Sequence, residues 1–424
     1  MDIQHDTAKV KSSDLAQRQL KSVPLLLCSL LFMSAGYSYA DDNMNETEVK
    51  KNHIDFGGAI RARFDFDPDR DIRKLSFDTL ILNTDFSYEK LSGSFEYRIL
   101  GGAYPYDYTD HIGDISFPKK AYVEYAVDDK QAVQFGLNQV PIGFQPYYTS
   151  TVIESIAYIA GIEDLYRVGL KYNYKNENSE VLLGYYFANA WKGKGTTNGA
   201  YYSNVIVSAN ESLENGTQYK EQDAVALQYN YTQKNEDWTA NYGMSGYYSK
   251  LDAENKKDDN ASRKIYGLHY GINNDRVGLK LITLFNHIDT PYDQTTFGSY
   301  DGEFNVANKG VIYSADLNYK IPELNIKDIN DFNIYLHYSY YDKDKKDFLN
   351  SSQFVVGSAF TYKKNFYIAS EWLFGKNNPY IGGSDYGQSL ASGGSNQWEN
   401  QLNIRSLAKV IIASLSGLRV QQLS

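Results

Sequence analysis

The sequence predicts an all-β fold, a transmembrane antiparallel β-barrel of about sixteen strands, from its residue alternation, its loop lengths and its tyrosine content. After the first forty residues, apolar and polar side chains alternate one by one. In the first such segment Ile54, Phe56 and Ile60 share one parity, whereas Asp55 and Arg61 have the other. Successive side chains of a strand point to opposite faces, so one face can contact lipid and the other water. The chain is therefore expected to line a pore.

Composition agrees with a membrane barrel. The chain has 39 tyrosines among 424 residues, and tyrosine suits the boundary between water and lipid. The mean hydropathy of −0.51 is compatible with a barrel because only every second strand residue needs to be apolar. A formal net charge of −10 leaves no basic surface for nucleic acid, so no nucleic-acid partner is expected.

The first forty residues have the pattern of a cleaved export signal. Basic residues precede an apolar run from Val23 to Met33, and Ser38 and Ala40 occupy the −3 and −1 positions of a cleavage site. The run is shorter than the roughly 20 residues that span a bilayer. The prediction is a signal peptide over residues 1–40 and a mature chain in the outer membrane of a Gram-negative cell. The single cysteine, Cys28, would leave with the signal.

The barrel is predicted over residues 41–405. Reading the chain with a period of two gives candidate strands that begin near Ile54, Leu80, Ser94, Lys120, Gln131, Tyr166, Glu180, Ala224, Trp238, Ile265, Val277, Val311, Phe332, Phe354, Phe366 and Trp398.

Connection lengths give independent support. Short turns follow several even strands, for example Lys90–Gly93 and Asp128–Lys130, whereas long polar connections such as Asn189–Gln222 and Lys376–Asn396 follow odd strands. This sorting predicts short periplasmic turns at one rim and long extracellular loops at the other, where they would meet lipopolysaccharide.

The chain beyond Arg405 departs from the pattern. Residues 406–424 are predicted to form an atypical C-terminal tail, because Leu407 to Leu415 is apolar without alternation and suggests a helix or an irregular stretch. Such barrels normally close on a strand that ends in an aromatic residue, and this chain ends with Ser424. The hypothesis is an altered terminus that impairs insertion.

Two stretches resemble the phosphate-selective porin O/P-like family. Ala121–Tyr125 followed by Gln134–Phe144 is similar to the family's signature, with Leu137 where the family has Gln, and Gln397–Ile404 is similar to the start of its last strand. The resemblance implies a sixteen-stranded barrel, a homotrimer, and a third loop that narrows the pore. Here that constriction loop would be residues 140–165, with Pro141 and Gly143 at its beginning and Glu154 within it.

Charged residues are predicted on the pore wall by strand parity. The candidates are Arg61, Arg63, Arg98, Lys120, Glu124, Arg167 and Lys171. Acidic residues such as Asp65 and Glu96 share their face, so the wall has both signs of charge. A phosphate-selective channel needs a row of Arg and Lys side chains that bind the anion one after another. A wall with both acidic and basic side chains indicates a general or weakly selective channel.

The predicted function is a passive diffusion channel for ions and small hydrophilic solutes. No Ser-His-acid set can be assembled, and neither enzyme activity nor a cofactor nor a metal site is expected. One alternative is a barrel that acts as an adhesin or receptor. Others are an anion-selective channel and a sugar-selective channel that uses Tyr122, Tyr186, Tyr335 and Tyr341 on the wall.

Overall fold

The structure is a computed structural model that describes residues 52–68, 70–102, 109–195, 200–254, 261–300, 302–322, 326–363, 365–381 and 385–416. All of them belong to one compact unit, Tyr37–Ser424. The predicted signal peptide and residues 417–424 of the predicted tail lie outside the described part of the chain.

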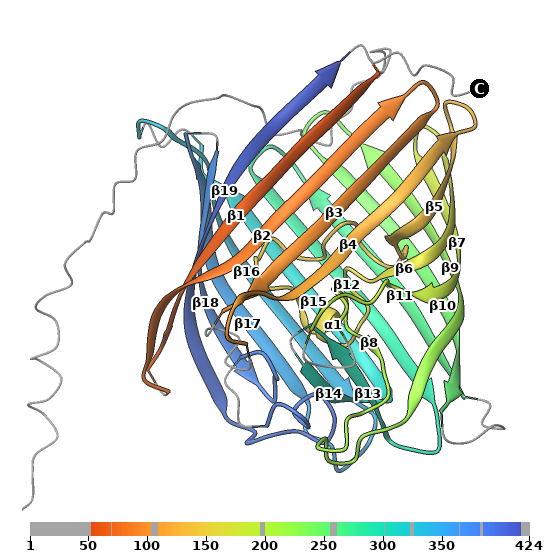
Figure 1. Ribbon diagram of the computed structural model, residues 1–424, viewed down its shortest axis with the longest axis vertical. Coiled ribbons are helices and arrows are strands. Elements are labelled where there is room, and N and C mark those ends of the chain that lie inside the picture. Colours follow the sequence, from red (N-terminus) through yellow and green to blue (C-terminus); the bar gives the residue numbers. More distant parts are fainter. Residues whose placement is uncertain are drawn as a thin grey trace, which may run out of the picture. The chain divides into compact units, whose positions relative to one another are not determined.

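Sixteen strands close into an antiparallel barrel, which confirms the predicted fold class (Figure 1). The first eight are β1 (His53–Asp67), β2 (Ile72–Tyr88), β3 (Leu91–Gly101), β4 (Ile112–Ala126), β5 (Gln131–Gln139), β6 (Tyr166–Lys175), β7 (Ser179–Asn189) and β9 (Tyr219–Lys234). The other eight are β10 (Thr239–Ala253), β11 (Ala261–Asn273), β12 (Val277–Asp289), β15 (Lys309–Lys320), β16 (Ile329–Lys343), β17 (Ser351–Tyr362), β18 (Phe366–Lys376) and β19 (Trp398–Ser416).

Alternating burial explains why these segments form a membrane barrel. In β9, Val225 and Leu227 are 47% and 53% exposed on the outer face, whereas Ala224, Ala226 and Gln228 are buried on the inner face. Lipid can cover the outer side chains, and closure of the sheet satisfies every strand's backbone hydrogen bonds without water. No helix among the described residues is long and apolar enough to cross a membrane.

The connections are sorted by length between the two rims, as the sequence predicted. Residues 89–90, 127–130 and 176–178 make short turns, whereas residues 140–165, 190–218 and 377–397 are long. One connection differs: β2 begins at Ile72 instead of near Leu80, so residues 68–71 join β1 and β2 by a short turn. The two strands are simply longer than the alternation suggested.

The C-terminal segment corrects the sequence prediction. Residues 406–416 continue β19 instead of forming a helix or irregular tail. β19 pairs with β18 as far as Ala408 and with β1 from Leu402 to Ser416, which lies opposite His53. The physical reason is closure, because without this segment the edge of β1 would leave unpaired N–H and C=O groups.

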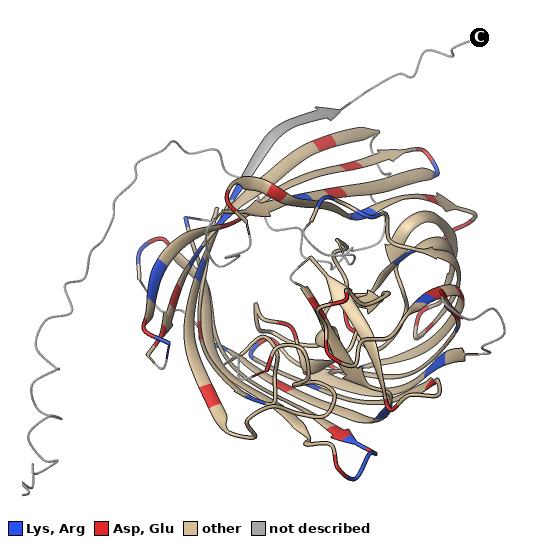
Figure 2. Ribbon diagram, turned by 60° about the horizontal axis from the view of Figure 1, so that its bottom comes forward, with Lys and Arg blue, Asp and Glu red and all other residues tan. Residues whose placement is uncertain are grey.

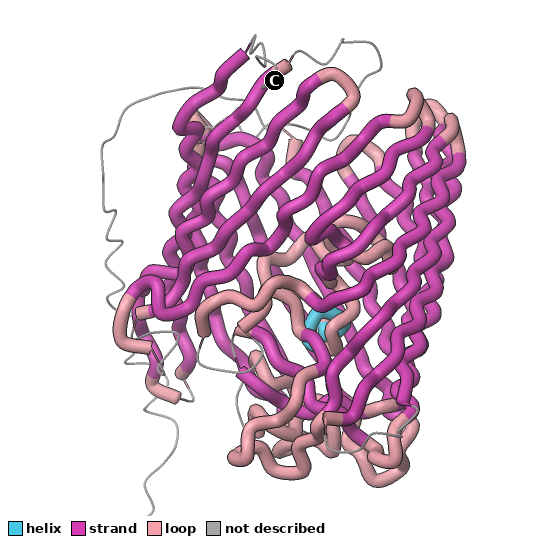
Figure 3. Tube along the Cα trace, turned by 45° about the vertical axis from the view of Figure 1, so that its right-hand side comes forward, coloured by secondary structure: helices cyan, strands magenta, loops and turns pink. Residues whose placement is uncertain are grey.

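Long connections fold into the barrel and form a core there. β8 (Val205–Ile206), β13 (Gln294–Ser299) and β14 (Gly302–Ala307) make a separate three-stranded sheet whose residues are all buried. The short helix α1 (Ile156–Ile159) belongs to the same hydrophobic cluster. Figure 3 shows the helix in cyan, enclosed by the barrel strands. This interior core leaves only part of the lumen open.

Candidate functional site

The connection of residues 140–165 runs across the inside of the barrel. The two ends of the connection are joined by a hydrogen bond from the Val140 N–H to the Leu165 carbonyl at 2.8 Å. The Gly143 N–H donates to Ser245 Oγ of β10 at 3.0 Å. Further along, the Ile156 N–H donates to Ser339 Oγ of β16 at 3.2 Å. The connection therefore reaches wall strands on the other side of the ring.

Gly143 explains why the chain can turn inward at this point. Its φ of +64° is a conformation that favours glycine, and a Cβ there would lie 2.5 Å from Ile282 Cδ1 and 2.7 Å from Tyr148 Cζ. Pro141, two residues earlier, is buried at the end of β5. Proline lacks an N–H for the sheet, so pairing stops there.

Two wall carboxylates hold the middle of this connection. Asp316 of β15 accepts hydrogen bonds from the Ser150 N–H at 2.9 Å and from Ser150 Oγ at 2.6 Å. Glu371 of β18 accepts from the Val152 N–H at 2.5 Å and from the Ile153 N–H at 3.3 Å. Charge-assisted bonds to backbone amides fix the path of the chain more firmly than neutral ones.

A third carboxylate, Glu163, stabilises the connection from within. It accepts hydrogen bonds from the Tyr148 N–H at 2.8 Å, from the Ser155 N–H at 3.0 Å and from Ser155 Oγ at 2.6 Å. Burial raises the pKa of Glu163 to about 7, although these donors favour the charged form. Ser155 also caps α1 by accepting from the Ala157 N–H.

Two cavities lie against the connection of residues 140–165. The first, of about 820 Å³, contacts Val152, Ile153, Glu154 and Tyr158. It extends to long-loop residues, namely Asn210, Ser212, Leu213, Glu214, Pro379, Tyr380 and Asp385–Gln388. The second, of about 870 Å³, contacts Gly143, Phe144, Gln145 and Ser150 and extends to the short turn at residues 273–278. One cavity therefore leads toward each rim. We call the first the loop-side cavity and the second the turn-side cavity.

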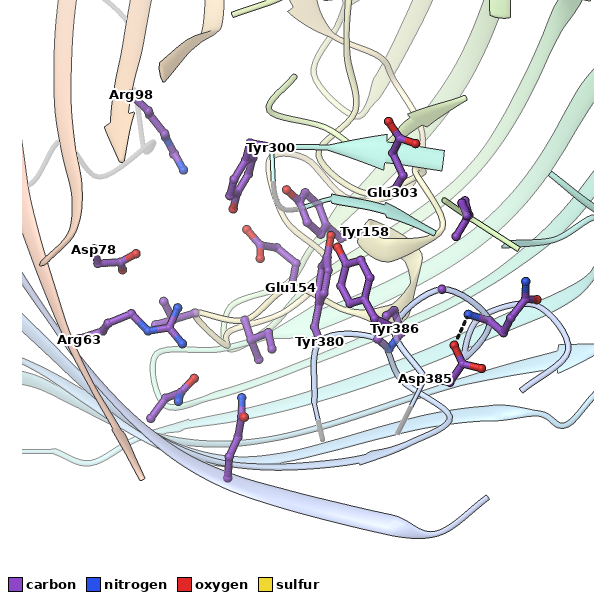
Figure 4. A pocket seen from close by; sticks show the side chains of 18 of the residues that line it. Arg63, Asp78, Arg98, Glu154, Tyr158, Tyr300, Glu303, Tyr380, Asp385 and Tyr386 are labelled. Carbon is purple, nitrogen blue, oxygen red and sulfur yellow. Dashed lines mark hydrogen bonds between the residues drawn. The ribbon is translucent and has the colours of Figure 1, made fainter. Parts of the chain in front are cut away.

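Three predicted wall arginines line the loop-side cavity, and each has a carboxylate partner. Arg61 Nε lies 2.5 Å from Asp78, Arg63 Nη2 lies 2.6 Å from Asp65, and Arg98 Nε lies 2.7 Å from Glu96. Figure 4 shows Arg63, Arg98 and Asp78 on one side of the cavity, across from Glu154 and a group of tyrosines. Neighbouring acids therefore offset much of the positive charge of these arginines.

Other predicted wall residues lie elsewhere on the inner face. Lys171 lines the turn-side cavity and donates to the Gln139 carbonyl at 3.0 Å. Glu124 is half-buried and accepts from Gln134 Nε2 at 2.7 Å. Lys120 pairs in register with Glu96. None of these three lines the loop-side cavity.

Arg167 corrects the predicted pore wall. Its side chain is 0% exposed and makes an ion pair with the buried Glu221, with Nη1 2.6 Å from the carboxylate. It also donates to the Gln222 carbonyl at 2.6 Å. Strand parity predicts its inward direction, but its guanidinium is held by residues of the strands β9 and β10, including Tyr247. Arg167 therefore does not face open space.

The sequence prediction missed several basic residues on the inner face, of which Lys119 and Arg405 lie beside predicted wall residues. Lys119 points inward because a register shift in β4 lies beside Lys120, and its ammonium pairs with Asp164 at 2.9 Å. Arg405 lines the loop-side cavity, whereas the predicted barrel ends at this residue and so gives it no place on the wall. A bulge cannot be located from alternation alone, but the unbroken β pattern through Ile404 was a signal for Arg405.

Tyrosines also differ from the predicted arrangement. Tyr186, Tyr335 and Tyr341, which were candidates for a sugar-binding wall, are at most 2% exposed. The rings that border the loop-side cavity come from the long connections instead: Tyr158, Tyr300, Tyr380 and Tyr386. Loop residues have no strand parity, so alternation could not identify them. Within the described residues no group of three or more His, Cys, Asp or Glu side chains is placed to hold a metal ion.

Charges are segregated across the interior. Basic lining residues of the loop-side cavity come from the barrel strands β1, β3 and β19, whereas its acidic residues, apart from Asp78, come from connections. Figure 2 shows acidic positions in red on the segments that cross the inside of the ring. The cavity therefore has arginines on its wall side, three of them paired with wall acids, and carboxylates on its loop side.

Comparisons with known proteins identify the fold class. No family model matches the sequence, and no curated protein matches it. Among solved structures, the chain is similar to an anion-selective porin from Comamonas acidovorans, with 12% identity and a TM-score of 0.52 over 84% of this chain and 98% of that one.

It is also similar to the outer-membrane channel DcaP of Acinetobacter baumannii, with 11% identity and a TM-score of 0.52 over 86% of this chain and 99% of that one. A third similar structure is OprB of Pseudomonas putida, with 10% identity and a TM-score of 0.51 over 85% and 94%. At these identities the likeness concerns the fold. The chain has the barrel of outer-membrane porins.

Proposed function

We propose that this protein is an outer-membrane porin that conducts ions and small hydrophilic solutes passively, without a chemical step. The observation that carries the proposal is the pair of cavities inside the closed barrel, one toward each rim, on either side of residues 140–165. This connection is then the constriction loop, and solutes pass between it and the wall of β1, β3 and β19.

Arg405 and Glu154 are the charges that filter ions in this proposal. Arg405 makes no ion pair with any described residue, in contrast to Arg61, Arg63 and Arg98. Glu154 faces the same cavity, and its carboxylate has no ion-pair partner among the described side chains. Arg405 and Glu154 interact with each other electrostatically, and Arg405 also interacts with Asp78 and Glu371, but neither Arg405 nor Glu154 forms a direct ion pair with a described residue. A charge without a direct ion pair acts on a passing ion more strongly than a paired one, so these two residues are assigned as the filter.

Reversal potentials test this assignment. In a planar bilayer with a salt gradient, Arg405→Gln is expected to shift the ion preference toward cations and Glu154→Gln toward anions. A unit charge about 4 Å from an ion is worth about 1 kcal/mol even in water, so the permeability ratio should change about fivefold. The exposed short-turn variants Lys234→Gln and Glu236→Gln serve as matched controls and should leave the ratio unchanged.

Two results would contradict the proposal. If the purified protein gives no steady open current, it is not a channel, and the adhesin or receptor alternative becomes the better explanation of its long loops. If both interior variants keep the wild-type permeability ratio while the protein conducts, Arg405 and Glu154 are not the filter.

The ion preference should also depend on pH. Burial raises the pKa of Glu154 above the ordinary glutamate value, with a further contribution from Asp164. As pH falls, Glu154 therefore loses its negative charge earlier than an exposed glutamate does, and the preference should move toward anions. Reversal potentials measured between pH 8 and pH 4 should show this shift in the wild type. The shift should be absent or much smaller in Glu154→Gln.

Membership of the phosphate-selective porin O/P-like family and assembly as a homotrimer are part of the proposal. The two sequence stretches described above support the family, and the apolar outer face of the strands is compatible with contacts between barrels in lipid. The pairing of three wall arginines with acids favours a weakly selective channel over a dedicated phosphate channel.

A further inference from the structure

We propose that the loop-side cavity is a binding site for zwitterionic solutes, namely amino acids and short peptides with free amino and carboxyl ends. The inference rests on the proposed channel function, because these solutes would reach the constriction through this cavity. It adds the solute class and the residues that hold each end.

The anionic end of the solute is assigned to Arg405 and Arg63. These residues lie directly opposite each other in the register of β19 and β1. Like charges at such positions destabilise a sheet. Asp65 binds Arg63 through two hydrogen bonds, at 2.8 and 2.6 Å, but no described carboxylate pairs with Arg405. Its buried Nε has no hydrogen-bond partner. Arg405 Nη1 donates to the Val152 carbonyl at 3.4 Å, and Asp78 and Glu371 act on Arg405 electrostatically without forming an ion pair with it. A solute carboxylate would form the direct ion pair that Arg405 lacks among the described residues, and guanidinium groups bind carboxylates in a bidentate manner.

The cationic end is assigned to Glu154 and the neighbouring tyrosine rings. Figure 4 shows Glu154 beside Tyr158, Tyr300 and Tyr380, on the side of the cavity away from Arg63. Phe304 supports the rings of Tyr380 and Tyr386 edge-on, at centroid distances of 6.0 and 5.7 Å. An ammonium group is stabilised both by a carboxylate and by the faces of aromatic rings.

The charge balance favours a solute with both charges. Four arginines and five carboxylates line the cavity, so its net charge is close to neutral, and a simple anion would gain little from it. Apart from Asp78, the two signs lie on opposite sides, which matches a molecule with separated charges. The volume of about 820 Å³ lies in the usual range of small-molecule sites and leaves room for a short peptide.

Current block by peptides tests the inference. Trialanine, N-acetyl-trialanine and trialanine amide have nearly the same size, but they are zwitterionic, anionic and cationic. Each is titrated onto single wild-type channels in a planar bilayer. Because a hydrogen bond to a charged group is worth about a tenfold change in affinity, trialanine should block at about tenfold lower concentration than either derivative.

Two variants test which residue binds each charged end of the peptide. In Arg405→Gln, trialanine and trialanine amide should block alike, because the carboxylate contact is lost. In Glu154→Gln, trialanine and its N-acetyl derivative should block alike. Lys234→Gln and Glu236→Gln, at the exposed short turn, should keep the wild-type order.

Equal block by all three peptides in a conducting wild-type channel would overturn the zwitterion site and leave the channel function intact. Stronger block by the N-acetyl derivative would overturn it in favour of an anion site. If the protein does not conduct, the channel proposal fails, and calorimetric titration of the folded protein in detergent with the same peptides decides the site. There too, tighter binding of trialanine supports the site and equal binding rejects it.

Discussion

Replacing Asp316 and Glu371 together by alanine is expected to turn a steady channel into a noisy one with a larger mean conductance. The two carboxylates bind the backbone N–H groups of Ser150, Val152 and Ile153. Hydrogen bonds to charged groups are worth about 1.5–3 kcal/mol each. Their loss should let this part of the constriction loop leave the wall.

The measurement is single-channel recording of the double variant beside the wild type. A matched control replaces Glu236 and Asp237, two exposed carboxylates of the turn between β9 and β10, by alanine. The control should keep the wild-type open level. Heat-modifiable migration on gels should show that both variants still form barrels. A steady wild-type current in the folded Asp316→Ala, Glu371→Ala variant would show that other contacts suffice to hold the loop.

Part of this arrangement could be predicted from the sequence because it follows from local alternation. The positions of the sixteen strands follow from which side chains face lipid. Those side chains must be apolar, so every second residue of a strand is apolar. The predicted start near Gln131 coincides with β5, and the one near Phe366 coincides with β18. Residues 407–415 were not predicted to form a strand because apolar residues there occupy consecutive positions.

The interior was harder to predict because its contacts join residues far apart in the chain. The inward direction of Arg61, Arg63 and Arg98 follows from parity, but their charge state at the pore depends on partners such as Asp78. Arg167 is buried by partners on β9 and β10 that are more than fifty residues away in the chain, and no local pattern predicts such contacts. The same is true of the tyrosines of the long loops, which border the cavity in place of the wall tyrosines.

Arg167 provides the prediction with the largest expected effect on stability. Replacing it by methionine should lower the free energy of unfolding by about 3–5 kcal/mol, because Glu221 would stay buried without its counter-ion. Glu221 would keep its hydrogen bonds from Tyr247 at 2.7 Å and Ser249 at 2.5 Å and a weaker electrostatic interaction with Arg263, but no direct ion pair. Urea unfolding of the barrel in lipid vesicles, followed by tryptophan fluorescence, measures the change.

A double variant separates the buried charge from the lost packing. Replacing both Arg167 and Glu221 by methionine removes the unpaired charge, so it should recover most of the stability lost in the single variant. If the double variant is as unstable as the single one, the loss comes from packing instead.

The reversal potential of Arg167→Met then distinguishes a structural residue from a filter residue. Parity alone placed Arg167 on the pore wall, where its loss would change ion preference as strongly as Arg405→Gln. Its complete burial and its ion pair with Glu221 predict an unchanged permeability ratio in a less stable barrel. A shift comparable to that of Arg405→Gln would mean that the contacts around Arg167 open during conduction and expose it to passing ions.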